Sequence, residues 1–190
     1  MLYIFGDCHV ESMHDLNIKT DNIKLIGIRG LWSSSLNINE LKKIQFVGAK
    51  KYIIPVDQNI IFFLGHADIR NTKPVYEEIE IKVDNYVAFA TKYLRPYFRN
   101  VYFAEPWPIW SDSHPDKILA EEYFKKALHI AVEKYNTKIV ITQKEVYQYI
   151  GKDGVPESEN VKEKNGVGLT WPDHYLEKVL NLIIAKSLTL

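Results

Sequence analysis

Five short apolar runs, separated by amphipathic helical patterns or polar connections, constrain the fold of this chain more than any other feature. Each is four to six residues long and rich in β-branched or aromatic side chains, which is typical of a buried strand. The runs are Leu2–Phe5, Ile23–Ile28, Ile60–Leu64, Val101–Ala104 and Lys138–Ile141. Strands that alternate with helices predict an α/β fold, with a mainly parallel sheet covered by helices on both faces.

Helical patterns lie between these runs. The predicted helix starts are Asn37, Pro74, Ser113 and about Pro172. Asn37 with Glu40, and Ser113 with Asp116, resemble capping boxes, in which two side chains satisfy the backbone of the first turn. The first helix would run to about Val47. The polar stretch Gly151–Leu169 fits neither pattern, and it is either a lid or a disordered connection.

Composition limits the classes of function. The 190 residues are most simply one domain over 1–190, and the 24 basic residues balance the 24 acidic ones. The sequence has no basic patch interleaved with aromatics, which nucleic-acid binding would favour. It also has no apolar run that approaches the roughly 20 residues of a membrane span. One cysteine excludes an internal disulfide and suits a reducing compartment, so we expect a cytoplasmic protein. Its oligomeric state is left open.

Cofactor and metal signatures are also missing. The sequence has neither a Walker loop nor a Gly-x-Gly-x-x-Gly fingerprint, so no nucleotide or dinucleotide cofactor is expected. Its six histidines are scattered, and there is no cysteine pair and no His-x-x-x-His spacing. These spacings are what a structural or catalytic zinc site would need, and we expect no metal.

Reactive side chains follow the strands. The four segments are Gly6-Asp7-Cys8-His9, Arg29-Gly30-Leu31-Trp32, Gly65-His66-Ala67-Asp68-Ile69-Arg70 and, before the last predicted helix, Trp171-Pro172-Asp173-His174. The carboxyl ends of parallel strands open into the ligand crevice of a doubly wound sheet. We therefore expect all four segments to gather at one edge.

In these segments the sequence resembles the SGNH (GDSL-like) hydrolase superfamily. The family's first block reads Gly-Asp-Ser with serine as nucleophile, and here Cys8 takes the place of the serine. Its second block supplies an oxyanion-hole glycine, which matches Gly30. The resemblance implies a flavodoxin-like α/β/α sandwich with five parallel strands in the order 2-1-3-4-5. It also implies an esterase or acyltransferase whose substrate is an ester, perhaps an O-acetyl group on carbohydrate.

The third and last blocks match less closely. The third, usually Gly-x-Asn-Asp, lacks its asparagine here and is closer to a Gly-Glu-x-Asp-x-Arg version with His66 in place of the glutamate. The last, usually Asp-x-x-His, keeps the histidine as His174 but has Trp171 where the acid belongs. By this resemblance the backbone amides of Cys8 and Gly30 donate to the oxyanion. The other residues expected to line the site are Asp7, Gly65, His66 and Asp68.

The two departures from the family are chemically consistent with each other. A thiol ionises more easily than an alcohol, and a helix N-terminus would lower the pKa of Cys8 further. With His174 as the base, such a nucleophile depends less on a carboxylate than serine does. Two alternatives stay open: Cys8 is a small buried residue at a tight turn, and the chain is a non-catalytic binding or assembly module on the same fold.

The remaining acidic and imidazole groups each have two interpretations. Asp173 is either the missing catalytic acid or the N3 member of a capping box that starts at Thr170. His174 is either the base or a histidine that hydrogen-bonds locally at the start of a helix. His9 and His66 compete with it at the same edge, whereas His129 lies in a helix and is expected to be structural.

Three further residues could contact substrate. Arg70 could bind an anionic group, although an ion pair with Asp68, or a bracing role for both in the third loop, is an alternative. Trp107 and Trp110, in a loop after the fourth strand, could stack on sugar rings or clamp acyl chains. The alternative for both tryptophans is a loop packed on its own side chains.

Overall fold

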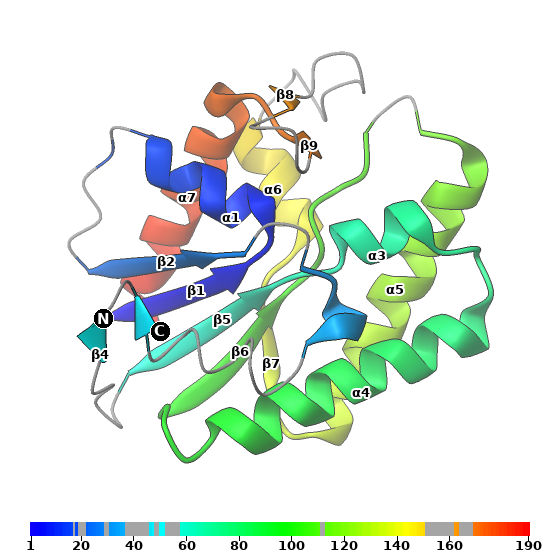
Figure 1. The fold of residues 1–190 in the computed structure, drawn as a ribbon, viewed down its shortest axis with the longest axis horizontal. Coiled ribbons are helices and arrows are strands. Elements are labelled where there is room, and N and C mark those ends of the chain that lie inside the picture. The colour runs from blue at the N-terminus through cyan, green and yellow to red at the C-terminus, as the bar shows by residue number, and fades with distance from the viewer. Residues whose placement is uncertain are drawn as a thin grey trace.

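Five parallel strands form the central sheet of the protein, seen in a computed structural model that describes residues 1–16, 18, 22–28, 31–36, 46–47, 50–51, 58–110, 113–150, 162–163 and 169–190 (Figure 1). The strands are β1 (Leu2–Gly6), β2 (Ile23–Gly27), β5 (Asn59–Phe63), β6 (Asn100–Ala104) and β7 (Lys138–Ile141). Their spatial order is β2-β1-β5-β6-β7, and each neighbouring pair is parallel. The predicted α/β fold and strand order 2-1-3-4-5 are confirmed.

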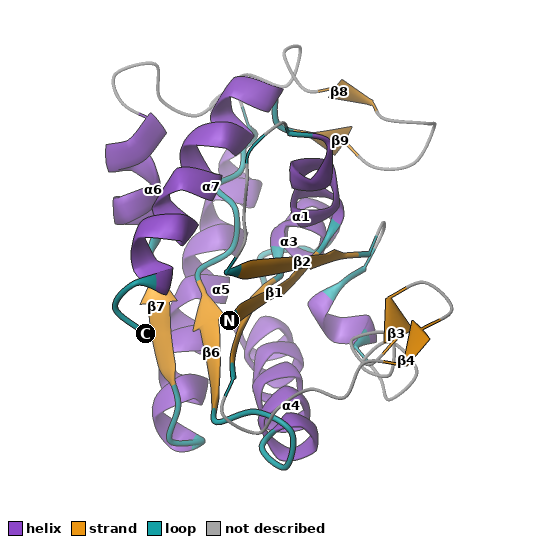
Figure 2. Cartoon of the chain, turned by 90° about the vertical axis from the view of Figure 1, so that its left-hand side faces the viewer, coloured by secondary structure: helices purple, strands orange, loops and turns teal. Residues whose placement is uncertain are grey.

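Helices cover both faces of this sheet, as Figures 1 and 2 show. One face carries α1 (Cys8–Ser12), α6 (Gln143–Ile150) and α7 (Asp173–Ser187), and the other carries α3 (His66–Asn71), α4 (Tyr76–Leu94) and α5 (Pro115–Lys134). Two 3-10 turns, η1 (Met13–Asp15) and η2 (Ser33–Ser35), follow α1 and β2. No helix in the described ranges is long and apolar enough to cross a membrane.

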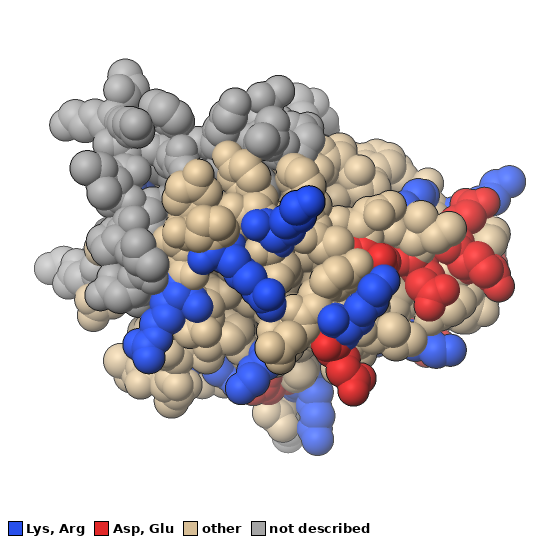
Figure 3. Space-filling model, turned by 90° about the horizontal axis from the view of Figure 1, so that it is seen from below, with Lys and Arg blue, Asp and Glu red and all other residues tan. Residues whose placement is uncertain are grey.

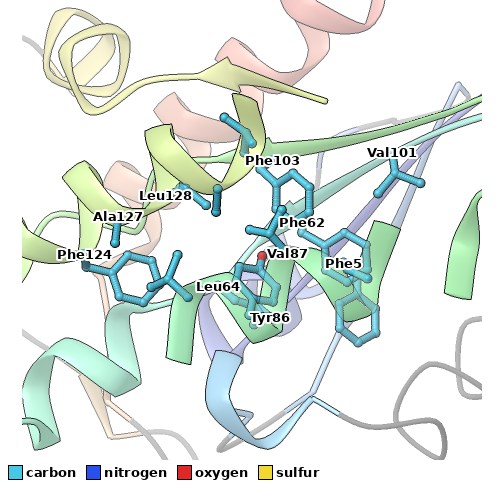
Figure 4. Close-up of a cluster of buried hydrophobic side chains, with 14 of the residues drawn as sticks. Phe5, Phe62, Leu64, Tyr86, Val87, Val101, Phe103, Phe124, Ala127 and Leu128 are labelled. Atoms are coloured by element: carbon cyan, nitrogen blue, oxygen red, sulfur yellow. The ribbon is translucent and has the colours of Figure 1, made fainter. Parts of the chain in front are cut away.

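The alternation of side chains along each strand divides the core into two layers. In β1, Tyr3 and Phe5 belong to the cluster packed under α4 and α5, whereas Leu2 and Ile4 belong to the cluster under α7. Figure 4 shows part of the first cluster, where Phe62 of the neighbouring strand is fully buried. Burying one such aromatic side chain stabilises the fold by roughly 1.5–3 kcal/mol. Both faces of the sheet are therefore apolar, as its central, parallel strands require.

Two helices begin later than the sequence predicts, whereas α7 begins at Asp173, in agreement with the predicted start at about Pro172. Helix α4 begins at Tyr76 rather than Pro74. Helix α5 is capped by His114 rather than Ser113, because Nδ1 of His114 accepts a hydrogen bond from the amide of Asp116 at 3.3 Å. The sequence predicts none of α1, α3 and α6, which are too short to show a clear helical period.

Two predicted segments lie largely outside the described residues. The predicted helix from Asn37 to about Val47 is described only at its end, where β3 (Phe46–Val47) pairs with β4 (Lys50–Lys51) as antiparallel strands. Within the stretch predicted as a lid or disordered connection, the structure describes β8 (Lys162–Glu163) and the first residue of β9 (Leu169–Thr170), which also pair antiparallel.

Candidate active site

The end of β1 places Cys8 at the carboxyl edge of the sheet, where it is the first residue of α1 and only partly buried. Gly6 makes the close packing at this turn possible, since a Cβ there would lie 2.2 Å from Cγ2 of Val10 and 2.9 Å from the Phe63 carbonyl oxygen. Asp7 caps α1, and its Oδ1 accepts the backbone N–H of His9 at 3.0 Å. The sequence prediction that Cys8 follows a strand at a tight, glycine-led turn agrees with this geometry.

A second interaction, between the two side chains, joins Asp7 to His9. Oδ1 of Asp7 lies 3.0 Å from Nδ1 of His9, and both side chains are buried. Burial raises the pKa of Asp7, but the charge and hydrogen bonds of His9 and the charge of His66 outweigh it, so the carboxyl group stays below its usual pKa. Asp7 is therefore an anion whose partner is the adjacent imidazole.

The Asp7–His9 pair decides which proton His9 can take. Sγ of Cys8 is 3.9 Å from Nδ1 of His9, the same nitrogen that faces Asp7. A carboxylate only accepts, so Nδ1 carries the proton that it donates to Asp7, and it cannot accept one from the thiol. His9 is therefore held by its hydrogen bonds with Asp7 and does not act as a base on Cys8 in this arrangement.

The pKa of the Cys8 thiol differs from the sequence expectation. Burial first, and then the negative charge of Asp7, raise the pKa of Cys8, while the positive charge of Arg70 lowers it by less. The prediction that the helix N-terminus lowers this pKa is therefore wrong, because α1 has only five residues and its cap is an anion. Cys8 is a thiol at neutral pH.

His66 lies beside His9 in a cluster of buried rings that the sequence did not predict. Its ring centroid is 4.7 Å from that of His9, and its Nδ1 donates to the carbonyl oxygen of Trp107 at 3.2 Å. Burial and the charge of His9 lower the pKa of His66 to about 3. His66 is consequently a neutral imidazole with a buried Nε2, which is not positioned as a base for Cys8.

The two predicted binding tryptophans have different environments. Trp107 is fully buried, stacked between Phe63 at 4.4 Å and His9 at 4.9 Å between ring centroids. Its role is therefore packing, and a contact between its ring and substrate does not fit this geometry. Trp110 is partly buried, and the guanidinium of Arg70 lies over its ring at 4.3 Å. Arg70 and Trp110 remain candidates for contact with a ligand.

Asp68 connects the third loop to the second. Its Oδ2 accepts the backbone N–H of Ser33 at 2.7 Å, and its Oδ1 accepts that of Ser34 at 3.2 Å. Among the described side chains it makes no ion pair with Arg70, so the expected Asp68–Arg70 pair is replaced by a bracing role for Asp68. Gly30, the predicted oxyanion donor, lies outside the described residues.

Gly65 is required by the backbone at the start of α3. Its φ is +120°, a conformation that side chains disfavour, and a Cβ there would lie 2.6 Å from the ring of Phe124. The glycine of the third block therefore allows the turn that brings His66 beside His9 and Asp68 beside the second loop. Its described role is to shape the site.

The start of α7 lies at the rim of this site. Trp171 is fully buried, with its ring centroid 5.3 Å from that of Trp107 and 6.3 Å from that of His9. His174 is exposed, and its ring lies 4.0 Å from that of Tyr175. Within the described residues no hydrogen bond joins His174 to Cys8, so its role as base stays a prediction.

The predicted cap at Thr170 is not formed. Thr170 belongs to β9, the N-cap of α7 is Pro172, and Asp173 is the first residue of the helix. The sequence pattern misplaces the cap because Pro172 has an extended backbone, with φ −55° and ψ 149°, and is itself the residue that precedes the first helical turn. Asp173 lies exposed in the first turn, where a negative charge favours the helix dipole.

A metal is not needed to explain the residues at this edge. Of the described chain, only Asp7, Cys8 and His9 bring three possible ligand atoms within 4.8 Å of one another. The shortest contact in this group is the hydrogen bond from Nδ1 of His9 to Asp7. We therefore explain the cluster by hydrogen bonding and assign no metal to it.

Comparison with known proteins identifies the fold. No family model and no curated protein matches the sequence. Three solved structures superpose on nearly the whole chain. An alpha/beta hydrolase from the metagenome of Lake Arreo has 13% sequence identity and a TM-score of 0.60, over 98% of this chain and 94% of that one. A G-D-S-L family lipolytic protein from Veillonella parvula has 16% identity and a TM-score of 0.57, over 100% of this chain and 96% of that one, and a carbohydrate acetylesterase from Sinorhizobium meliloti has 14% identity and a TM-score of 0.57, over 99% and 98%. The chain has an SGNH-like hydrolase fold.

Proposed function

We propose that this protein is an esterase or acyltransferase that uses Cys8 as its nucleophile and acts on an ester, such as an O-acetyl group on carbohydrate. The observation that carries the proposal is the position of Cys8, partly exposed as the first residue of α1 at the end of a central strand. The acetylesterase from Sinorhizobium meliloti with the same fold supports the choice of substrate class.

The chemistry starts from a protonated thiol. As Sγ of Cys8 attacks the ester carbonyl carbon, the imidazole of His174 takes the thiol proton. The carbon–oxygen bond to the alcohol then breaks, and the same proton passes to the departing oxygen. Water, or a second alcohol, attacks the resulting thioester and regenerates the thiol, so the reaction is hydrolysis or acyl transfer.

The backbone supplies the stabilising donors. Cys8 occupies the first position of α1, where a backbone N–H has no partner within the helix, and in this proposal that N–H donates to the oxyanion. In this proposal the amide of Gly30 is the second donor. The proposal requires the exposed imidazole of His174 to approach the thiol, whereas the one ring contact described for it is with Tyr175.

Hydrolysis of p-nitrophenyl acetate tests the proposal. The wild-type protein should release p-nitrophenol and become acetylated on Cys8, as peptide mass spectrometry would detect. Cys8→Ala and His174→Ala should lose the activity, whereas His129→Gln, a change in an exposed helical histidine that pairs with Glu105 at 2.7 Å, should retain it. Equal rates in the wild type and Cys8→Ala would refute a role for Cys8.

A second candidate is a binding or assembly module without catalysis. The raised pKa of Cys8 and the engagement of Nδ1 of His9 by Asp7 favour it, because together they leave the thiol protonated and without an adjacent base. In that case neither p-nitrophenyl acetate nor an acetylated carbohydrate is turned over, and iodoacetamide reacts with Cys8 only at strongly alkaline pH. His174→Ala then leaves the alkylation profile unchanged.

A further inference from the structure

A groove between η2 and α4 contains about 410 Å³ of space, within the roughly 300–1,000 Å³ that small-molecule sites occupy. We call it the lysine groove and define it by Lys82, Tyr86, Phe89 and Lys92 of α4 and by Ser33 and Ser34 of η2. None of these residues has a role in the reaction proposed above. The groove is thus a separate feature of the same sheet edge.

The helical wall of the groove has a regular arrangement. Phe89 follows Lys82 by seven residues and Lys92 follows it by ten, so all three lie on one face of α4, with the two lysines about 15 Å apart along the helix axis. No Asp or Glu is among the described residues that line the groove. This wall therefore presents an aromatic ring between two lysine side chains.

The distribution of charge on this side of the molecule is consistent with that wall. Figure 3 views the protein from below, the side on which α4 lies in Figure 1, and Lys and Arg side chains gather over the left and middle of that face. Acidic side chains lie toward its right and in its lower middle. The first turn of α4 carries Glu77 and Glu78. An anionic ligand is favoured at the end of α4 that carries Lys92.

The walls of the groove also contain buried polar atoms that the described chain does not satisfy. Oγ of Ser33 and the hydroxyl of Tyr86 have no hydrogen-bond partner in the described chain, and each residue is only 2% exposed. Both oxygens are closed off from the groove itself. The uncharged polar residues that a ligand could reach there are the exposed Ser34 and Asn85.

Asp68 connects the groove to the reacting group. It fixes the Ser33 and Ser34 amides by hydrogen bonds of 2.7 and 3.2 Å, and it belongs to α3 together with Arg70. The charge of Arg70 acts on Cys8, so its guanidinium lies near the thiol. The groove is therefore linked to the neighbourhood of the thiol through α3 and its hydrogen bonds to η2.

We infer that the lysine groove binds a carboxylate-bearing sugar of an oligosaccharide, so that the substrate of this protein is an acidic glycan ester; this inference rests on the proposed function. A sugar ring packs its apolar face on Phe89, its carboxylate pairs with Lys82 or Lys92, and its hydroxyls hydrogen-bond to the exposed side chains of Ser34 and Asn85. A neutral glycan would use only the aromatic and hydroxyl contacts.

Calorimetric titration of the Cys8→Ala protein with tetragalacturonate, and with its neutral methyl ester, tests the inference without turnover. Tetragalacturonate should bind at least about tenfold more tightly than the methyl ester, a difference of about 1.4 kcal/mol. The double change Lys82→Glu and Lys92→Glu should abolish that preference. Lys138→Glu, the same charge reversal at an exposed position on β7, should bind as the parent does.

Each outcome of the titration is decisive, provided that circular dichroism shows the variants folded. Equal binding of the acid and its methyl ester would overturn the inference, as would undiminished binding by the doubly reversed variant. Preferential binding that depends on Lys82 and Lys92 would support the groove even if the wild type hydrolyses no ester. Such a result would separate the failure of the esterase proposal from that of the groove.

Discussion

The Asp7 carboxylate lies 3.0 Å from Nδ1 of His9 and belongs to the residue directly before Cys8, so one anion both holds the imidazole and raises the pKa of the thiol. Cys8 follows the end of β1, where our proposal places the nucleophile. Here its chemistry depends on its immediate neighbour, and the first prediction follows from that dependence.

Asp7→Asn should make Cys8 more reactive at a given pH. The amide keeps an oxygen that can accept the N–H of His9, but the negative charge that raises the pKa of Cys8 is lost. The pH profile of alkylation by iodoacetamide should therefore move to lower pH. Glu11→Gln is the matched control, because Glu11 makes the smallest contribution to the same pKa. A larger shift in the control than in Asp7→Asn would contradict this assignment.

Trp107→Ala should destabilise the fold strongly. Its side chain is fully buried between Phe63 and His9, and removing a buried tryptophan typically costs about 3–5 kcal/mol of unfolding free energy. Urea denaturation measures the loss, and Trp32→Ala, at a ring that is 37% exposed, serves as the control. If Trp107 were a surface for substrate, its replacement would leave the denaturation midpoint nearly unchanged.

Trp107 and Cys8 show which features of the protein could be predicted from the sequence and which could not. Apolar runs predicted all five strands of the sheet, because each run is a local property, and the order of the motifs along the chain agreed with the strand order. The burial of Trp107 could not be predicted, since it depends on contacts with Phe63 and His9, which are distant in sequence. The raised pKa of Cys8 likewise depends on burial and on the orientation of the Asp7 side chain.

The role of Asp68 illustrates the same limit. The sequence offered Arg70 as a partner because the two residues are close in the chain, yet the carboxylate accepts amides that are 34 and 35 positions away. Capping signals also misplaced helix caps by a few residues, as at His114 and Pro172. Local patterns therefore predicted which segments meet at the edge of the sheet, whereas side-chain orientation decided what each residue does there.

Asp68→Ala should loosen η2 more than it weakens the whole fold. Removing the carboxylate leaves the amides of Ser33 and Ser34 without their acceptor, at a cost of about 1–3 kcal/mol. Hydrogen exchange read by mass spectrometry should show faster exchange in peptides that contain these amides. The control, Asp84→Asn, breaks a partly exposed contact with Lys134 and should leave η2 unchanged. Uniformly faster exchange across the sheet would argue against a local role for Asp68.

His66 predicts a specific loss of stability in acid. Its pKa is about 3 in the fold and about 6.5 in the unfolded chain, so between those values the unfolded state binds more protons. The stabilisation is complete above about pH 6.5 and falls as the pH drops toward 3. The unfolding free energy of His66→Asn, measured over the same range, should depend less steeply on pH. An identical slope in the two proteins would place the acid sensitivity in other groups.

Asp173→Asn should affect stability more than reactivity. Asp173 is the first residue of α7, where a negative charge contributes about 0.3–1 kcal/mol through the helix dipole. Loss of the acid in a catalytic triad instead lowers the rate by about 10⁴, because the imidazole can then take the wrong tautomer. Thermal melting and the rate of p-nitrophenyl acetate hydrolysis separate these outcomes, with Glu177→Gln, an exposed carboxylate further into the same helix, as the control. An unchanged melting temperature together with a rate near the background would make Asp173 the acid that orients His174, and the helix-dipole interpretation would then be wrong.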